Sequence, residues 1–478
     1  MQDVPTLHAV VLTVICCELK CHLVVALAET VIHHFEENMQ EQINPLERLY
    51  NLLEDSQWWP QHRLFEMQQI QLAELVTHAR ASSPFYKTRL DCLYRPNGTI
   101  NWDRWTDVPI MTRQQLSFEQ ASIQSTMPVQ EHGPFGSVQT SGSTGDPVKF
   151  LTTRILNDLS VTSLWRSQKW AKMDWSSSLI NIGIESPRWK DGDVMGSWGP
   201  HWLKDAAKGK RIFATYATTP DDRVDLIKKY DADYAAFTNG VSLSFVEHVR
   251  DNQIPVSLKA VQFIGGTATD YLRKNFLEYL KADIFELYSS KEGGSIAHPC
   301  PLGHGWHQNA ESVLLEIVDD NGKPVAPGET GRVIITPFGN TITPLIRYDQ
   351  GDLAVAGPTE ICPCGRTLPR IAEFSGRIRH RLTKPNGEII YDLPIEMRQQ
   401  LGAGIWQVAR VAEHSYEVRY KKRDWGTEPN IEEFRKSFIK HFYPEAELRI
   451  IEVDSFVLGP TGKHLERLDE WDPSVWLG

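Results

Sequence analysis

Cysteine is scarce in this chain, with seven among 478 residues. The number is odd, and the cysteines fall into clusters rather than into a regularly spaced framework. Small secreted proteins that depend on disulfides carry many more cysteines, usually in even number. The cysteine content therefore argues against a disulfide-stabilised secreted protein and favours a reducing cytoplasm.

Positive charge is not in excess either, because 50 Lys and Arg residues against 61 Asp and Glu residues give a net charge of −11. A nucleic-acid-binding protein usually carries a basic surface, so a nucleic-acid partner is not indicated. A site for a small phosphate ligand remains compatible with an acidic protein. Such a site needs only a few backbone N–H groups and one or two cations.

The chain has no long uninterrupted hydrophobic run. The apolar stretch of residues 7–31 is interrupted by Glu18, Lys20, His22 and Glu29. A bilayer requires about 20 mostly apolar residues, so these side chains make a spanning helix costly. A signal peptide would require a basic residue ahead of its apolar region, and no basic residue precedes this stretch. We interpret residues 1–38 as an amphipathic helix or an extension of unclear role, with Met39 as an alternative natural start.

The length of 478 residues exceeds one ordinary hydrophobic core, so at least two domains are expected. Residues 45–92 repeat apolar positions at intervals of three and four, which is typical of helices, and S-S-P-F-Y at residues 82–86 ends this helical region. From residue 136 onward, β-rich apolar runs alternate with helical stretches, which indicates a parallel or mixed sheet. We expect an α/β fold with a large N-terminal domain at residues 39–376 and a small α+β domain at residues 377–478.

The strongest local motif is V-Q-T-S-G-S-T-G-D-P at residues 138–147. Its glycines allow the backbone to approach a ligand closely, and its N–H groups and hydroxyls can surround phosphate oxygens. It is not a Walker loop, because the terminal G-K-[ST] is missing. A plain surface turn is the alternative interpretation.

The segment T-S-G-S-T-G-D-P resembles the phosphate loop of the adenylate-forming superfamily of acyl-CoA ligases, adenylation domains and luciferases. S-P-F-Y ahead of the loop and C-P-C-G-R-T-L-P-R-I behind it resemble the phenylacetate-CoA ligase-like branch. The likeness extends over about residues 80–467. It implies that the small domain is mobile and that ATP binds between the domains. Phosphate contacts would come from the loop, with Thr140 also assigned to catalysis: Thr140, Ser141, Gly142, Ser143, Thr144 and Gly145.

The resemblance also assigns two motifs to the adenine ring. Tyr288, in L-Y-S-S-K-E-G-G, would stack on the adenine, and Ser289 stands beside it where the family has glycine. The turn I-G-G-T would line the adenine with the residues Gly265, Gly266 and Thr267. Without the other motifs of the chain, Tyr288 would be interpreted as a core tyrosine and I-G-G-T as a simple strand-to-helix turn.

Ribose, phosphate and magnesium contacts are implied for five further residues. In R-Y-D-Q-G-D, Asp352 would accept hydrogen bonds from the ribose hydroxyls, and Arg377, in S-G-R, would contact ribose or phosphate. Glu292 would bind Mg²⁺, a hard cation that prefers carboxylate and phosphate oxygens, and would serve catalysis. Lys291 replaces the usual hydroxyl near the α-phosphate and either binds phosphate or marks altered chemistry. Lys463, in L-G-P-T-G-K, matches the catalytic lysine that would stabilise the transition state.

Two Cys/His segments, C-P-L-G-H-G-W-H and C-P-C-G, precede the presumed hinge. Cysteine and histidine are the ligands that structural zinc sites use, and some members of the branch carry such a site. Four protein ligands would leave no open position, so the zinc would be structural. The alternative is a set of reduced, buried cysteines with a surface histidine. The candidate ligands are Cys300, Cys362, Cys364 and either His307 or His304.

These assignments predict ATP-dependent activation of a carboxylic acid as an acyl-AMP, with release of pyrophosphate and transfer to an acceptor. The branch suggests an aromatic acid, with CoA as the default acceptor. The hinge departs from the family pattern, because Arg379 and His380 stand where acidic residues are usual. Residues 383–387, T-K-P-N-G, also replace a segment that lines the pantetheine tunnel. The alternative acceptors are a carrier-protein thiol and an amine. An alternative of another class is a weakened nucleotide-binding protein without ligase activity. A homodimer is compatible with the sequence.

Overall fold

The computed structural model describes most of the chain between residues 44 and 471. Residues 1–38, the loop at 140–147, residues 265–267 and Lys463 lie outside the described part, so the expectations for them stay predictions. Within the described part, no helix is long and apolar enough to cross a membrane. The described residues are 44–139, 148–183, 187–264, 268, 270–377, 382–383, 389–390, 397, 400–401, 403–422, 428–442, 445–453, 456–457 and 467–471.

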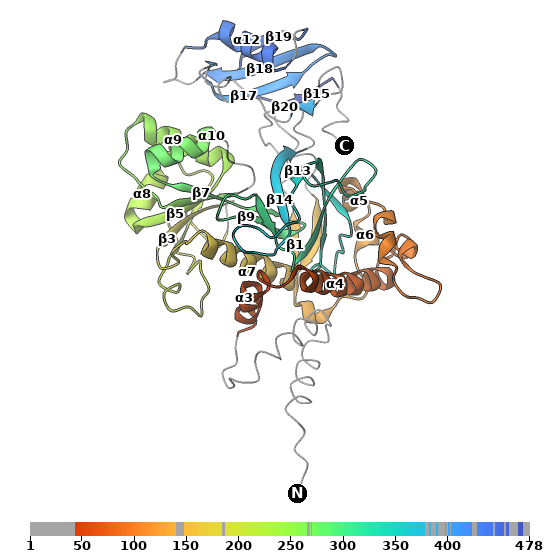
Figure 1. The fold of residues 1–478 in the computed structure, drawn as a ribbon. Helices are drawn as coiled ribbons and strands as arrows, with labels where there is room; N and C mark the ends of the chain where they lie inside the picture. The colour runs from red at the N-terminus through yellow and green to blue at the C-terminus, as the bar shows by residue number, and fades with distance from the viewer. Residues whose placement is uncertain are drawn as a thin grey trace.

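Helices make up much of the chain ahead of the first strand and recur between the later strands (Figure 1). The helical expectation for this region is confirmed over Pro45–Ser56 and Gln61–Ser82, and the S-S-P-F-Y segment at residues 82–86 ends it as expected. Ser83 is extended, with ψ 119°, because a residue that precedes proline avoids the helical region. The α-helices are α3 (Pro45–Ser56), α4 (Gln61–Ser82), α5 (Arg113–Phe118), α6 (Gln120–Ile123), α7 (Arg154–Trp170), α8 (Pro220–Tyr230), α9 (Asn239–Asp251), α10 (Asp270–Asn275) and α12 (Ile431–His441).

Five parallel strands form one sheet, in the order β4-β3-β5-β6-β7. Its apolar side chains pack with those of α8, α9 and α10 into one core that includes Ile180, Phe237 and Phe263. Parallel strands need crossover connections, and the intervening helices supply them, as the alternating pattern predicts. The strands are β3 (Ser178–Gly183), β4 (Arg211–Thr215), β5 (Ala232–Thr238), β6 (Ala260–Ile264) and β7 (Asp283–Glu286).

Seven antiparallel strands form a second sheet, in the order β11-β12-β13-β14-β10-β9-β8. Only Leu287 separates the end of β7 from the start of β8, so the two sheets meet there. A separate pair, β1 (Phe135–Gln139) and β2 (Lys149–Thr153), flanks the predicted phosphate loop. The seven strands are β8 (Tyr288–Ser290), β9 (Gly294–Pro299), β10 (Trp306–Gln308), β11 (Val313–Val318), β12 (Thr330–Pro337), β13 (Tyr348–Ala356) and β14 (Arg370–Arg377).

The C-terminal part contains a four-stranded sheet, in the order β19-β18-β17-β20, packed against α12. Figure 1 draws it beyond the ends of β13 and β14. The α/β fold with a large N-terminal part and a smaller C-terminal part is confirmed, while the division at residues 376–377 stays a prediction. The strands of the C-terminal part are β15 (Leu382–Thr383), β16 (Ile389–Ile390), β17 (Ala403–Arg410), β18 (Ser415–Lys422), β19 (Glu447–Glu452) and β20 (Arg467–Asp469).

A buried ion pair joins the helical layer to the antiparallel sheet. Arg166 of α7 donates to Glu311, which lies between β10 and β11, at 2.6 Å, and the two side chains are 0% and 2% exposed. Arg166 also donates to the Leu53 carbonyl of α3 at 2.8 Å, and Ser56 donates to Glu311 at 2.6 Å. These bonds give partners to the Glu311 carboxylate and to both Nη atoms of Arg166, which offsets much of the cost of burying the pair, while Arg166 Nε has no partner among the described residues.

Glu311→Ala should lower the free energy of unfolding by about 3–5 kcal/mol, because Arg166 would be left buried without its counter-charge. The double variant Arg166→Met/Glu311→Leu removes both charges and should lose less. Chemical denaturation measures both values. As a matched control, Lys208→Ala removes the exposed pair with Asp205 and should change stability by less than about 1 kcal/mol. Equal losses for Glu311→Ala and the control would contradict this account.

Candidate active site

Two residues predicted to bind the nucleotide meet where the antiparallel sheet begins. Tyr288 is the first residue of β8, and Asp352 lies within β13. The Tyr288 hydroxyl donates a hydrogen bond to Asp352 Oδ2 at 2.8 Å, although the residues are 64 positions apart. Asp352 is buried, so this bond helps to hold its carboxylate in place. The fold thus brings together an aromatic ring and a carboxylate that can only accept hydrogen bonds.

The predicted adenine turn at residues 265–267 lies outside the described part, but both of its flanks are placed. β6 and β7 are parallel neighbours, and Phe263 pairs with Glu286 near their carboxyl ends. The Ala268 backbone N–H donates to Glu286 Oε1 at 2.7 Å, which ties the chain after the turn to the end of β7. The carboxyl edge of a parallel sheet is a common place for nucleotide binding. Ala268, which follows the turn in the sequence, is therefore held at the end of β7, next to the start of β8.

Glu292 is buried and faces two polar groups. Arg113 Nη1 lies 3.4 Å from Glu292 Oε1, and the Tyr348 hydroxyl donates to the same oxygen at 3.3 Å. Burial, and then the charge of Glu292, raise the pKa of Tyr348, so its hydroxyl keeps the proton that it donates. Lys291 and Ser289 are exposed beside this carboxylate in the sequence. The arrangement can bind cations and phosphate oxygens at one place.

Arg347 fixes the segment that leads to Arg113. The Arg347 side chain is 1% exposed, and the backbone has φ 51° immediately before β13. Its guanidinium donates to the carbonyls of Thr106 and Val108, each at 2.9 Å, and pairs with Glu316 at 3.0 Å. These bonds attach the segment ahead of α5 to the start of β13. Sequence analysis missed Arg113, because a lone arginine at a helix start carries no motif.

Phe374 of β14 is a second residue that sequence analysis missed. Its ring lies against the Tyr288 ring, with centroids 4.0 Å apart and planes inclined by 32°. The only signal in the sequence was an aromatic residue just ahead of the S-G-R motif at residues 375–377.

Arg377 ends β14, where its backbone pairs with Asp352, while its side chain lies outside the described part of the structure. The residues assigned to phosphate, Thr140, Ser141, Gly142, Ser143, Thr144 and Gly145, also lie outside the description.

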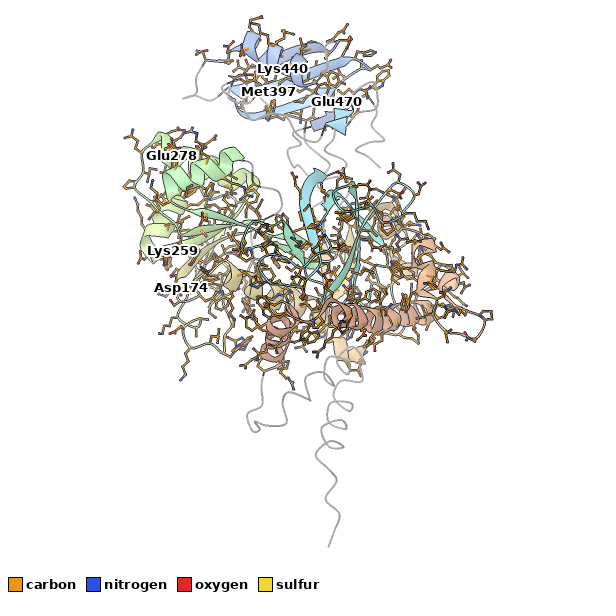
Figure 2. All side chains as sticks on the ribbon, viewed as in Figure 1. Asp174, Lys259, Glu278, Met397, Lys440 and Glu470 are labelled. Carbon is orange, nitrogen blue, oxygen red and sulfur yellow. The ribbon has the colours of Figure 1, made fainter. Side chains whose placement is uncertain are left out.

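Lys463 lies outside the described residues, but the chain on each side of it is attached to the C-terminal sheet. Gln407 Nε2 donates to the Val457 carbonyl at 2.7 Å. Arg419 donates to Glu470, labelled in Figure 2, at 2.7 and 3.0 Å. Val457 and Glu470, which lie on either side of Lys463 in the sequence, are therefore both hydrogen-bonded to residues of the C-terminal sheet.

Four predicted metal ligands come together in the antiparallel sheet, and we call Cys300, His307, Cys362 and Cys364 the Cys/His cluster. Their ligand atoms all lie within 4.8 Å of one another. Cys300 Sγ and Cys362 Sγ are 3.6 Å apart, and His307 Nε2 lies 3.2 Å from Cys364 Sγ. His304, the alternative ligand, is exposed and is not part of this group.

The Cys/His cluster is assembled by the pairing of β10 with β14. His307 pairs with Arg370 in that register, which brings the β9–β10 turn to the segment ahead of β14. Gly305 has φ 76°, and a side chain there would meet the Ile371 carbonyl at 2.3 Å, so the turn requires glycine. Burial lowers the pKa of His307 to about 4, which keeps the imidazole in the neutral form that binds metals. Three thiols and one neutral imidazole fit tetrahedral zinc coordination.

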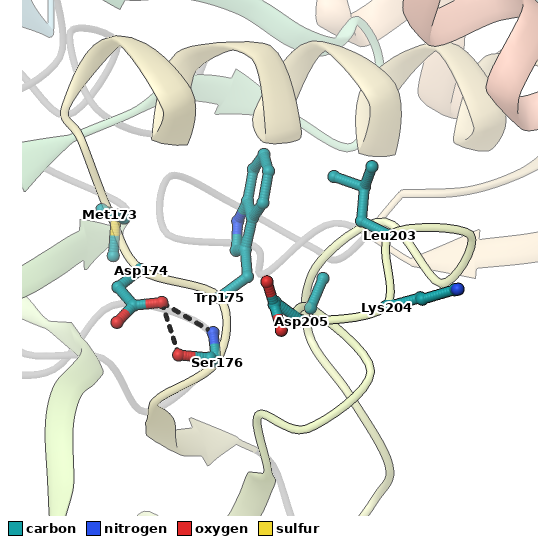
Figure 3. A pocket seen from close by; sticks show the side chains of 8 residues that line it. Met173, Asp174, Trp175, Ser176, Leu203, Lys204 and Asp205 are labelled. Atoms are coloured by element: carbon teal, nitrogen blue, oxygen red, sulfur yellow. Dashed lines mark hydrogen bonds between the residues drawn. The ribbon is translucent and has the colours of Figure 1, made fainter.

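A surface pocket of about 330 Å³ lies elsewhere, in the region of α7, β3 and the loop around Leu203. Figure 3 shows Trp175 and Asp205 at its wall, with Asp174 accepting hydrogen bonds from Ser176 at 2.9 and 2.7 Å. It contains none of the residues predicted for the nucleotide. We therefore place the candidate site at the sheet junction and not in this pocket.

No family model matches the chain, whereas comparisons with curated proteins and with solved structures find acyl-CoA ligases. Phenylacetate-coenzyme A ligase of Thermus thermophilus is 25% identical over 339 residues, which are 66% of this chain and 71% of that protein. Phenylacetate-coenzyme A ligase of Escherichia coli is 24% identical over 335 residues, 65% and 71% of the two chains.

Solved structures extend the likeness to almost the whole chain. A 2-hydroxyisobutyryl-CoA ligase in its postadenylation state matches 92% of this chain and 96% of its own, with a TM-score of 0.65 and 20% identity. Its open conformation matches 91% and 97%, with a TM-score of 0.57 and 19% identity. The chain therefore has the fold of these ligases, and its resemblance to the adenylate-forming superfamily and its phenylacetate-CoA ligase-like branch is confirmed.

Proposed function

We propose that this protein activates a carboxylic acid with ATP, forming an acyl-AMP and pyrophosphate, and then transfers the acyl group to CoA. The observation that carries the proposal is the contact between Tyr288 and Asp352 at the sheet junction. An aromatic face and a buried carboxylate are what an adenosine requires, one for the base and one for the ribose hydroxyls. The ligase relatives support the same reading.

The phosphates need positive charge, because an attacking carboxylate is repelled by them. Glu292 is the candidate Mg²⁺ ligand, since its carboxylate is buried beside Arg113 and the Tyr348 hydroxyl, four positions after Tyr288 in the chain. When bound, Mg²⁺ supplies charge that neutralises the phosphates. Arg113, next to Glu292, and Lys291 supply further cations from this chain. Their placement suits a triphosphate at this junction.

Lys463 is the proposed catalytic residue of the adenylation step. The carboxylate oxygen attacks the α-phosphorus, the bond to the pyrophosphate oxygen breaks, and pyrophosphate leaves with the electron pair. Negative charge builds up on the transferring group in the transition state. An ammonium there stabilises the transition state more than the ground state, which lowers the barrier.

We assign an aromatic acid as the substrate on the strength of the phenylacetate-CoA ligase likeness, and the cytoplasm as the location. The second candidate acceptor is a carrier-protein thiol or an amine. It is favoured by the basic residues Arg379 and His380 and by the T-K-P-N-G segment at residues 383–387. The Cys/His cluster is assigned a structural Zn²⁺ that would fasten the β9–β10 turn to the chain ahead of β14.

ATP–pyrophosphate exchange tests adenylation. The wild-type protein should catalyse exchange with aryl acids, and Lys463→Ala should reduce the rate by roughly 10²- to 10³-fold, the size found for loss of one transition-state contact. Lys440→Ala, an exposed lysine of α12 in the same C-terminal part, is the matched control and should retain activity. ADP binding without exchange for any acid would instead support a nucleotide-binding protein. Thioester or amide formation in a second assay then separates the acceptors.

Arg113→Met should slow the exchange by roughly 10- to 100-fold, because a hydrogen bond to a charged group contributes about 1.5–3 kcal/mol. Arg113→Lys keeps the charge and should recover part of the rate. Arg104→Met, which breaks an exposed pair with Asp107 in the same region, is the control. An Arg113→Met rate equal to that of the control would exclude Arg113 from the phosphate site.

The purified protein should contain about one zinc per chain, measured by inductively coupled plasma mass spectrometry. Cys300→Ser should lower both the zinc content and the melting temperature, since a structural metal contributes to folding stability. Cys92→Ser changes a cysteine outside the Cys/His cluster and should leave both unchanged. Full stability of a zinc-free Cys300→Ser protein would refute the assignment.

A further inference from the structure

Three aromatic rings connect the Cys/His cluster to the predicted adenine face. Trp306 of β10 meets Phe374 of β14 edge to face, with centroids 5.1 Å apart and planes at 84°. Phe374 in turn lies against Tyr288 of β8, at 4.0 Å. Edge-to-face and offset-stacked pairs are the arrangements that aromatic rings prefer. A displacement of the Trp306 ring would therefore move Phe374 and change how Phe374 supports the Tyr288 ring.

Trp306 is linked to the Cys/His cluster through its own strand. The next residue, His307, contacts Cys364, while Trp306 contacts Phe374. Neighbouring residues of a strand point to opposite faces, so one short strand presents the imidazole to the cluster and the indole to the ring chain. β10 has only three residues, which leaves it dependent on its neighbours for its position.

Both strands that flank β10 also adjoin the cluster. Pro299, the last residue of β9, pairs with Trp306 and directly precedes Cys300. On the other side, Ile371 of β14 pairs with Trp306, and Cys362 lies in the segment that enters β14. A metal bound by the cluster would therefore hold β9, β10 and β14 together around Trp306.

We propose that Phe374 is a positioning residue for the adenine ring and that Trp306 couples it to the metal state of the Cys/His cluster. Phe374 supports the Tyr288 ring, while Asp352 holds the Tyr288 hydroxyl at 2.8 Å. The ring is thus fixed at two points before a nucleotide arrives, and a preorganised ring loses less freedom on binding. The inference rests on the proposed function, because it needs an adenine nucleotide on Tyr288.

Isothermal titration with ADP tests the positioning role without the chemical step. Phe374→Leu should raise the Kd for ADP by about three- to ten-fold, the range expected for loss of an aromatic pair. Phe245→Leu removes a buried ring that packs on Phe237 in the parallel-sheet core, and serves as the control for loss of an aromatic pair elsewhere. An unchanged Kd in Phe374→Leu overturns the positioning role while leaving the proposed function intact. A wild-type protein that does not bind ADP overturns both.

The coupling is tested by removing the metal with a chelator and restoring it with a zinc salt. In the wild type, chelation should raise the Kd for ADP, and zinc should reverse the change. In Trp306→Leu, the Kd should already be raised and should respond little to chelation, because the link is broken. Cys364→Ser, which removes a cluster ligand, should resemble the chelated wild type. Thermal unfolding of each variant confirms that it is folded.

An equal response of the wild type and Trp306→Leu to chelation would overturn the coupling, since the metal would then act by another route. Failure of zinc to bind would overturn it as well.

Discussion

The buried pair of Arg166 and Glu311 constrains how the layers of the large part can pack. Two charges removed from water need hydrogen-bond partners, so Leu53, Ser56 and Asn309 have to lie where their groups reach the pair. As a result α3, α7 and the start of β11 cannot shift independently of one another. The pair of Arg347 with Glu316 has the same effect at the start of β13. The guanidinium groups of Arg166 and Arg347 therefore both fix the position of the sheet that carries the candidate site.

The candidate site owes its position to the junction between two kinds of sheet. The parallel sheet delivers the end of β7 to one edge, and the chain then enters the antiparallel sheet through Leu287. Tyr288 lies at this crossing and meets Asp352 of β13, a strand that three others separate from β8 in the sheet order. With a net charge of −11, the protein needs local cations to hold a triphosphate, and Arg113 beside Glu292 provides one.

Short motifs in the sequence indicated which residues the fold would bring together, whereas the roles assigned to those residues stay predictions. The alternation of strands and helices, the contact of Tyr288 with Asp352 at one site, and the meeting of the three cysteines all agree with what the motifs indicate. The helical region expected ahead of the S-S-P-F-Y segment also agrees, because a residue that precedes proline, here Ser83, avoids the helical conformation. The phosphate contacts assigned to the loop at residues 140–147 and the catalytic role assigned to Lys463 stay predictions.

The sequence by itself determined the class of fold, the order of the motifs and the types of side chain, because each depends on residues that are neighbours in the chain. The tertiary structure alone decided that Arg113 faces Glu292 across 179 positions and that Phe374 supports Tyr288. It also selected His307 over His304 for the Cys/His cluster. These contacts depend on strand register and on buried hydrogen bonds between distant segments, and no local pattern of residues encodes either one.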